Sequence, residues 1–181
     1  MNFIDPHKDQ WRALGGEDGP AACIDPAPHR LLSIGQWHAF RAHWPAGMPV
    51  GVALANDAEV GDIASDLPRV SLIALEFPKW VDGRAYSQAH TLRARHRYAG
   101  ELRATGEVLV DMVLLLQRNG FTTAVLRADQ SLDDAHRALT FFPGHYQGAV
   151  TDPLPLFAKP PGTAQALVRQ HNPFVNSGAA I

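Results

Sequence analysis

The residues best suited to chemistry lie in one stretch, EFPKWVDGRAYS, at residues 76–87. The stretch combines two basic side chains, a turn and two hydroxyl groups, carried by Lys79, Asp82, Gly83, Arg84, Tyr86 and Ser87. Basic side chains beside the free backbone N–H groups of a helix start suit a small oxyanion or a phosphate group. We therefore expect an anion-binding site here. In the alternative interpretation Lys79 and Arg84 are solvated or pair with Asp82, and Trp80 closes the end of the sheet.

Two arginines outside this stretch extend the expected site. Arg103 lies within a short predicted strand and Arg127 ends another, so both side chains are expected at the same edge of the sheet as the first stretch. Leaving a buried charge without its partner costs about 3–5 kcal/mol. Each guanidinium group therefore needs a carboxylate, such as Glu76 or Asp129, or a bound anion.

Signatures of other chemistries are absent from the sequence. No GxGxxG, GxxxxGK[ST] or GxSxG motif occurs, so the sequence indicates no particular cofactor and assigns no catalytic residue. The nine histidines include no HExxH pattern, and we expect no metal site. The single cysteine, Cys23, excludes an internal disulfide, a CxxC pair and a four-cysteine zinc or iron–sulfur site. Any redox chemistry would need a centre supplied from elsewhere.

The elements that position these residues follow a βα rhythm. Apolar runs recur every 20 to 30 residues or so, as repeated βα units do. They predict strands at 31–34, 50–55, 70–77, 101–104 and 122–127. Between them, helical spacing predicts helices with caps at Asp82 and Ser131, one helix at 107–118, and left-handed terminating residues at Gly100 and Gly120. The pattern predicts an α/β fold with a mostly parallel sheet, either open and doubly wound or an incomplete barrel. Residues 76–87 would follow the carboxyl end of its strongest strand, where such sheets place ligands.

Composition suggests how the chain is organised. We expect an irregular lead-in at residues 1–30, a single α/β domain at 31–147 and a proline-rich tail at 148–181 that either extends freely or acts as an arm in a homo-oligomer. The N-terminus lacks a signal-peptide pattern and the longest apolar run is too short to span a bilayer, so we expect a cytoplasmic protein without a membrane partner.

Charge is distributed unevenly along the chain. The net charge of −2 argues against binding to nucleic acid. Between Lys79 and Arg103, however, six basic residues stand against two acidic ones. This basic strip either is a solvated helix face or meets an acidic partner.

Several blocks of the sequence together resemble one bacterial family. They are FPKWVDGRAYS, YAGELRATGEVLVDMVLLLQRNGF, AVLRADQSLDDA and Tyr146-Gln147, spread over about residues 50–147. They are similar to the family catalogued as domain of unknown function 934, except that Trp80 replaces a more usual phenylalanine. Members are commonly encoded beside the haemoprotein subunit of assimilatory sulfite reductase and are often labelled as oxidoreductases of sulfite reduction.

The resemblance implies a role in sulfite reduction and leaves three hypotheses open. In the first, the chain is an accessory or assembly factor that docks onto the sulfite reductase haemoprotein through its basic strip or its tail. In the second, it is an oxidoreductase-like enzyme or binding protein that holds sulfite, sulfate or a phosphate-bearing cofactor at the strand ends through Lys79, Arg84 and Arg103. In the third, it is a relative of a βα enzyme that has lost its chemistry.

Overall fold

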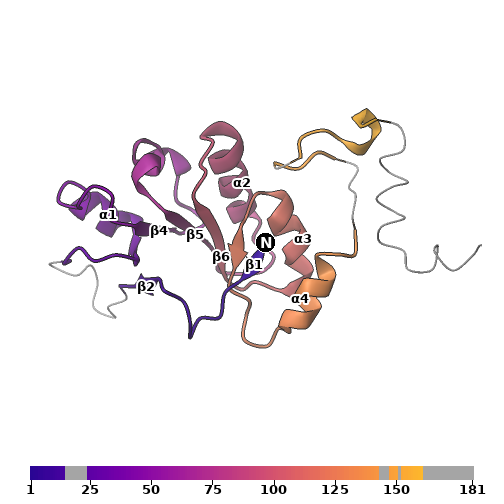
Figure 1. The fold of residues 1–181 in the computed structure, drawn as a ribbon, viewed down its shortest axis with the longest axis horizontal. Coiled ribbons are helices and arrows are strands. Elements are labelled where there is room, and N and C mark those ends of the chain that lie inside the picture. Colours follow the sequence, from indigo (N-terminus) through magenta and orange to yellow (C-terminus); the bar gives the residue numbers. More distant parts are fainter. Residues whose placement is uncertain (15–23, 143–146, 151, 161–181) are drawn as a thin grey trace, which may run out of the picture.

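Seven parallel strands form one sheet in the order β1-β7-β6-β5-β4-β3-β2 (Figure 1). The computed structural model describes residues 1–14, 24–142, 147–150 and 152–160. The strands are β1 (Asn2–Phe3), β2 (Arg12–Ala13), β3 (Arg30–Ser33), β4 (Val50–Leu54), β5 (Leu72–Phe77), β6 (Glu101–Gly106) and β7 (Thr123–Ala124). From β2 to β7, neighbours in the sheet are also neighbours in the sequence, so the strand order never reverses. The predicted α/β fold is confirmed, and its architecture is a half-barrel rather than a doubly wound sheet.

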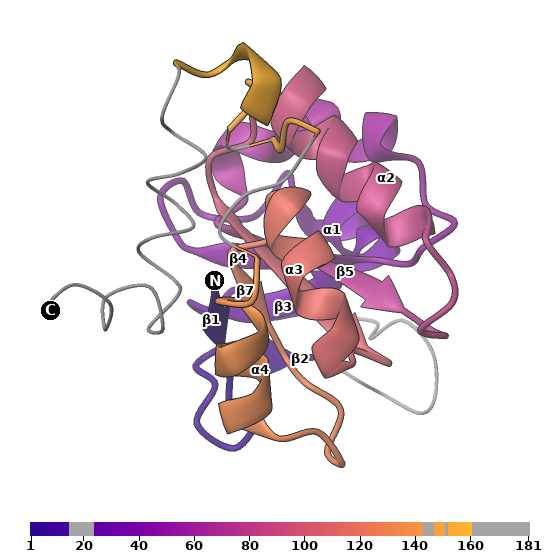
Figure 2. The same ribbon diagram turned by 90° about the vertical axis from the view of Figure 1, so that its right-hand side faces the viewer.

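The helices lie along the outer side of the half-barrel (Figures 1 and 2). They are α1 (Ile34–Phe40), the 3-10 helix η1 (Val60–Arg69), α2 (Arg84–His90), which continues as the π-helix η2 (Thr91–Arg95), η3 (Val110–Met112), α3 (Val113–Arg118) and α4 (Leu132–Ala138). The short 3-10 helix η4 (Leu156–Ala158) belongs to the C-terminal segment and lies apart from this layer in Figure 1. In the described part of the chain, no helix is both long and apolar enough to cross a membrane.

The main core lies between the sheet and this helical layer. Alternate residues of each strand point toward the helices, because successive side chains of a strand face opposite sides of the sheet. Leu54 on β4, Leu75 on β5 and Leu102 on β6 are fully buried there, together with Leu116 on α3. This burial fixes the register of the sheet, and with it the place of each loop at the carboxyl edge.

Two of the predicted helix ends are found as expected. Ser131 caps α4, with its hydroxyl accepting a hydrogen bond from the backbone N–H of Asp134. Gly120 follows α3 with a left-handed φ of 90°. The helix predicted at 107–118 begins only at Val110. Gly106 turns the chain with a φ of 89° and leads it past the end of β5 before the helix starts.

The prediction for Gly100 is wrong, because Arg97 is the left-handed residue, with a φ of 53°. The N–H of Tyr98 then donates to the carbonyl of Leu92 at 2.9 Å and closes the helix end. Gly100 has a different role. A Cβ atom there would stand 2.2 Å from the hydroxyl oxygen of Tyr98, so glycine lets the buried ring approach the chain closely.

The face of the sheet away from the helices is crossed by residues 4–11, which we call the strap. The strap joins β1 at one edge of the sheet to β2 at the other. Asp9 forms an ion pair with Arg103 of β6, and the ring of Trp11 packs on β4, where a Cβ atom at Gly51 would stand 3.1 Å from it. Part of the expected irregular lead-in thus contributes two edge strands and the strap between them. Cys23 and residues 161–181 of the proline-rich tail lie outside the described residues.

Candidate functional site

The turn at residues 78–83 leaves the carboxyl end of β5 and is held from both sides through Asp82. The Nδ2 atom of Asn56, in the loop after β4, donates to Asp82 Oδ2 at 2.7 Å. Arg84 donates from Nη2 to the same oxygen at 2.7 Å, and from its backbone N–H to Oδ1 at 3.2 Å. The hydrogen bonds from Arg84 lower the pKa of Asp82 to about 2. Asp82 therefore ties the turn to the neighbouring loop and accepts a hydrogen bond from the first backbone N–H of α2, although the N-cap position itself is Gly83 and not Asp82 as predicted.

The tip of this turn is apolar and exposed. Trp80 is 56% exposed and Val81 is 65% exposed, and Lys79 and Gly83 beside them are exposed as well. The expectation that Trp80 closes the end of the sheet is therefore wrong. Phe77 fills that position and is completely buried.

Tyr86 and Ser87 begin α2 but face different surroundings. The ring of Tyr86 packs edge-on against Phe77 at 5.0 Å and against Phe121 at 6.4 Å, and burial raises the pKa of its hydroxyl to about 12. Tyr86 thus anchors α2 on the core. Ser87 is exposed and lines a groove described below.

Arg103 lies in the middle of β6 on the strap side of the sheet, away from Arg84. It is 3% exposed. It donates to Oε1 of Glu101 from Nε at 3.0 Å and from Nη2 at 2.7 Å, and its Nη1 pairs with Asp9. Thr123 adds a hydroxyl hydrogen bond of 2.7 Å to the same oxygen of Glu101. The arginine is thus enclosed by two carboxylates and joins the strap to the sheet.

Arg127 follows β7 and is also paired. Its Nη1 donates to Glu107 at 2.6 Å, and its Nε and Nη2 donate to Asp129 at 2.6 and 2.7 Å. These hydrogen bonds raise the pKa of Arg127, and they lower the pKa of Asp129 to about 2. The three arginines of the predicted anion site therefore lie in three separate ion-pair clusters.

The carboxyl edge of the half-barrel is acidic as a whole. Its loops and strand ends at residues 55–59, 76–84, 107–111 and 125–131 carry three basic side chains and seven acidic ones. Excess negative charge lowers the local concentration of anions. Anion binding at Lys79, Arg84, Arg103 and Arg127 stays a prediction. The acidic edge gives an unfavourable potential for an anion at Lys79, Arg84 and Arg127, and Arg103 lies away from that edge.

The basic strip expected along the next helix is divided by the fold. Arg93 turns inward and donates to the backbone carbonyls of Gly120 and Gly100, each at 2.9 Å. Burial lowers the pKa of Arg93. Arg95 and Arg97 remain exposed.

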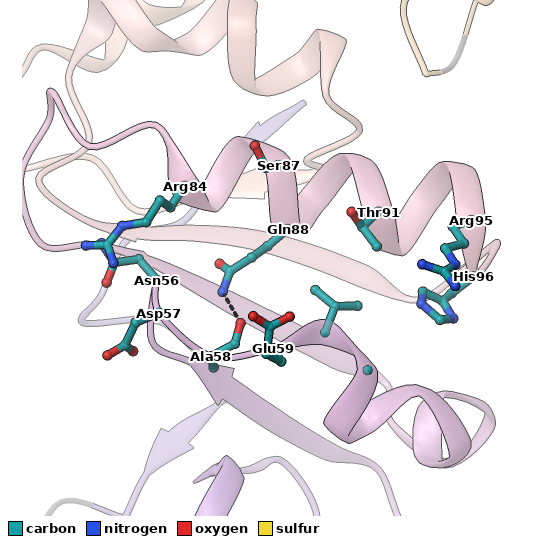
Figure 3. A pocket seen from close by; sticks show the side chains of 12 residues that line it. Asn56, Asp57, Ala58, Glu59, Arg84, Ser87, Gln88, Thr91, Arg95 and His96 are labelled. Atoms are coloured by element: carbon teal, nitrogen blue, oxygen red, sulfur yellow. Dashed lines mark hydrogen bonds between the residues drawn. The ribbon is translucent and has the colours of Figure 1, made fainter.

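A groove of about 590 Å³ runs between α2 and the loop after β4 (Figure 3). The wall formed by α2 and its π-helical continuation carries Arg84, Ser87, Gln88, Thr91, Arg95 and His96. Arg84, Gln88, Thr91 and Arg95 line one side of the helix because they follow one another at spacings of three or four residues, and Ser87 and His96 are their sequence neighbours. Residues 56–61 form the other wall.

Gln88 holds the two walls of this groove together. Its Nε2 donates to the backbone carbonyls of Ala55 and Ala58, both at 2.8 Å. Gln88 was not predictable as a site residue, because a glutamine in a helix carries no signal for such a role. Asn56 was detectable in principle, since it directly follows a buried strand at the carboxyl edge. Asp9 carried no signal, because its partner Arg103 lies 94 residues away.

Comparison with known protein families matches residues 51–157, more than half of the chain, to a family described as bacterial protein of unknown function (DUF934). The matched segment includes the turn after β5, both walls of the groove and the pairs of Arg103 with Glu101 and Arg127 with Glu107. A search of curated proteins finds no match.

Proposed function

The chain belongs to this bacterial family, and from that premise we propose that it is a non-catalytic docking protein of assimilatory sulfite reduction. Its proposed partner is the haemoprotein subunit of sulfite reductase. The subunit is suggested by the genes that commonly adjoin those of family members, and the mode of docking is argued from the surface of the molecule.

One observation carries the proposal: the most distinctive block of the sequence ends β5 in an exposed apolar tip on a fixed base. Trp80 and Val81 are both more than half exposed, while Asp82 is bound to Asn56 and Arg84 just beneath them. Tryptophan is enriched among the residues that dominate binding energy at protein interfaces. A turn that is already held in place loses little conformational entropy when a partner binds it.

The charges around the tip also favour a protein partner over a small anion. Arg84 and Arg127 are neutralised by carboxylates within the chain, and the surrounding edge has an excess of acidic groups. An anion would have to compete with those carboxylates. A protein surface with an apolar pocket for Trp80 and basic groups around it would complement this edge.

The proposal is tested by mixing the purified chain with the sulfite reductase haemoprotein at micromolar concentration and low salt, followed by size-exclusion chromatography. We expect the two to elute together. Separate elution of both proteins would refute the docking function.

A second measurement separates docking from anion binding. Thermal shifts of the chain alone are recorded with sulfite, sulfate, phosphate and flavin nucleotides. A ligand at 100 times its Kd would stabilise the fold by about 2.7 kcal/mol. We expect no shift. A shift that disappears in the Lys79→Ala/Arg84→Ala variant would favour the anion-binding hypothesis instead.

A further inference from the structure

The groove along α2 is polar and its charges are sorted along its length (Figure 3). Asp57 and Glu59, both exposed, stand on the loop after β4. Arg95 and His96 stand together at the far end of the helical wall. Within the described ranges, neither Glu59 nor Arg95 has an ion-pair partner. Arg84 also lines the end that carries Asp57, but it is paired with Asp82. The two unpaired charges, Glu59 and Arg95, therefore give the groove a carboxylate on the loop wall and a guanidinium group at its far end.

A buried acceptor lies in the helical wall, at Gln88. Gln88 is 93% buried, and its Nε2 is fully occupied by the two backbone carbonyls of the loop, which fixes the orientation of the amide. Its Oε1 has no hydrogen-bond partner among the described residues. Buried polar atoms are nearly always paired, so an open acceptor indicates a missing donor. The oxygen is shielded from bulk solvent, so a donor for it has to come from the groove that Gln88 lines.

The helical wall changes its winding where the groove reaches Arg95. Residues Thr91–Arg95 form a π-helix, and single turns of π-helix occur frequently at functional sites. The wider turn places Arg95 and His96 side by side at the end of the groove in Figure 3. Thr91, half-buried, adds a hydroxyl group between the two ends.

We propose that this groove binds a short, extended peptide with free termini. The terminal ammonium group has several N–H donors, and it meets two acceptors: the amide oxygen of Gln88 and the carboxylate of Glu59, which points toward Gln88 in Figure 3. The terminal carboxylate meets the guanidinium group of Arg95 and the imidazole of His96, and charge-assisted hydrogen bonds of this kind are the stronger ones. A ligand with charge of one sign only would be repelled by Glu59 or by Arg95.

The length of the groove sets the length of the ligand. Gln88 and Arg95 are seven residues apart, which corresponds to about 10 Å along a helix. An extended peptide advances about 3.3 Å per residue, so roughly three residues bridge the two ends. A single amino acid is too short to reach both.

The test titrates the full chain with trialanine, N-acetyl-trialanine and trialanine amide, and follows binding by NMR chemical shifts. We expect trialanine to bind with shifts confined to the groove. Each blocked peptide should bind at least about tenfold more weakly, because each lacks one charge-assisted contact. In Arg95→Gln, the affinity for trialanine should fall by a similar factor, and the affinity for trialanine amide should stay as it is in the unaltered chain. In Glu59→Gln, the affinity for trialanine should also fall, and the affinity for N-acetyl-trialanine should stay unchanged.

Arg97→Gln is the matched control, because Arg97 is exposed on the same segment but does not line the groove. It should leave all three affinities unchanged. The variants are on exposed side chains, and far-UV circular dichroism verifies that each is folded. Lack of binding of trialanine at about 10 mM, or equal affinity in Arg95→Gln, overturns the proposal. Equal binding of trialanine and its acetylated form also overturns it, and identifies the occupant as the C-terminus of a protein rather than a free peptide.

Discussion

The ion pair between Asp9 and Arg103 should hold the strap on the sheet, and Asp9→Ala tests how strongly. Arg103 is 3% exposed, and the side chain of Asp9 is 15% exposed, so the pair lies largely out of water. Its removal leaves the Nη1 group of a buried guanidinium without an acceptor. Glu101 still holds Nε and Nη2, so the cost stays below the roughly 3–5 kcal/mol of a buried charge left fully unpaired. The cost of Asp9→Ala is therefore closer to that of losing one charged hydrogen bond, about 1.5–3 kcal/mol.

We therefore expect Asp9→Ala to lower the free energy of unfolding by about 2 kcal/mol. For an m value of about 2 kcal/mol per molar urea, the unfolding midpoint falls by about 1 M. Lys8→Ala is the control in the same segment, because Lys8 is 84% exposed and meets Asp5 only at 3.7 Å. It should change stability by no more than about 0.5 kcal/mol.

A double-mutant cycle completes this test. In Asp9→Ala/Arg103→Met the buried charge is gone, so the double variant should be more stable than the sum of the two single changes predicts. A midpoint for Asp9→Ala that equals that of Lys8→Ala, or strict additivity in the cycle, would show that the strap is not held by this pair.

Two further predictions concern the carboxyl edge. Gly106→Ala would bring a Cβ atom to 2.5 Å from the backbone oxygen of Phe77 at a φ of 89°, and should destabilise the chain by at least about 2 kcal/mol, measured by urea unfolding. Gly61→Ala meets nothing within 4 Å and should be neutral, so equal effects of the two changes would refute the steric argument. Asp82 has its pKa lowered to about 2 from 3.8, so it stabilises the fold above about pH 4, and this stabilisation is lost as the pH falls from about 4 to 2. The urea midpoints of the unaltered chain and Asp82→Asn should converge over that range, and a constant difference would contradict the assignment.

Much of the sheet was predictable from the sequence because it is buried. The apolar runs that became β4 and β5 are nearly continuous, as in strands that are buried on both faces. The strands β1 and β2 were not predictable. Each has two residues, and each pairs at an edge of the sheet whose position depends on the rest of the fold. The choice of a half-barrel also depends on strand order, which the βα rhythm does not contain.

The candidate site was predictable in position but not in pairing. Residues 76–87 do leave β5 at its carboxyl end, as expected from the strength of that strand. Which carboxylate meets which arginine depends on contacts far apart in the sequence, such as Arg127 with Glu107. Asp82 is the exception, because it lies two residues from Arg84 and its pairing was foreseen as the alternative interpretation.

The docking function is tested most directly by titrating the sulfite reductase haemoprotein with the chain and with Trp80→Ala in a calorimeter. Leu115→Ala is the control, since Leu115 is an apolar side chain, 44% exposed, on α3. Loss of an interface residue of the dominant class costs at least about 2 kcal/mol, or roughly 30-fold in Kd. We predict that loss for Trp80→Ala and an unchanged Kd for Leu115→Ala. Equal affinities for Trp80→Ala and the unaltered chain, or no heat of binding with either, would contradict it.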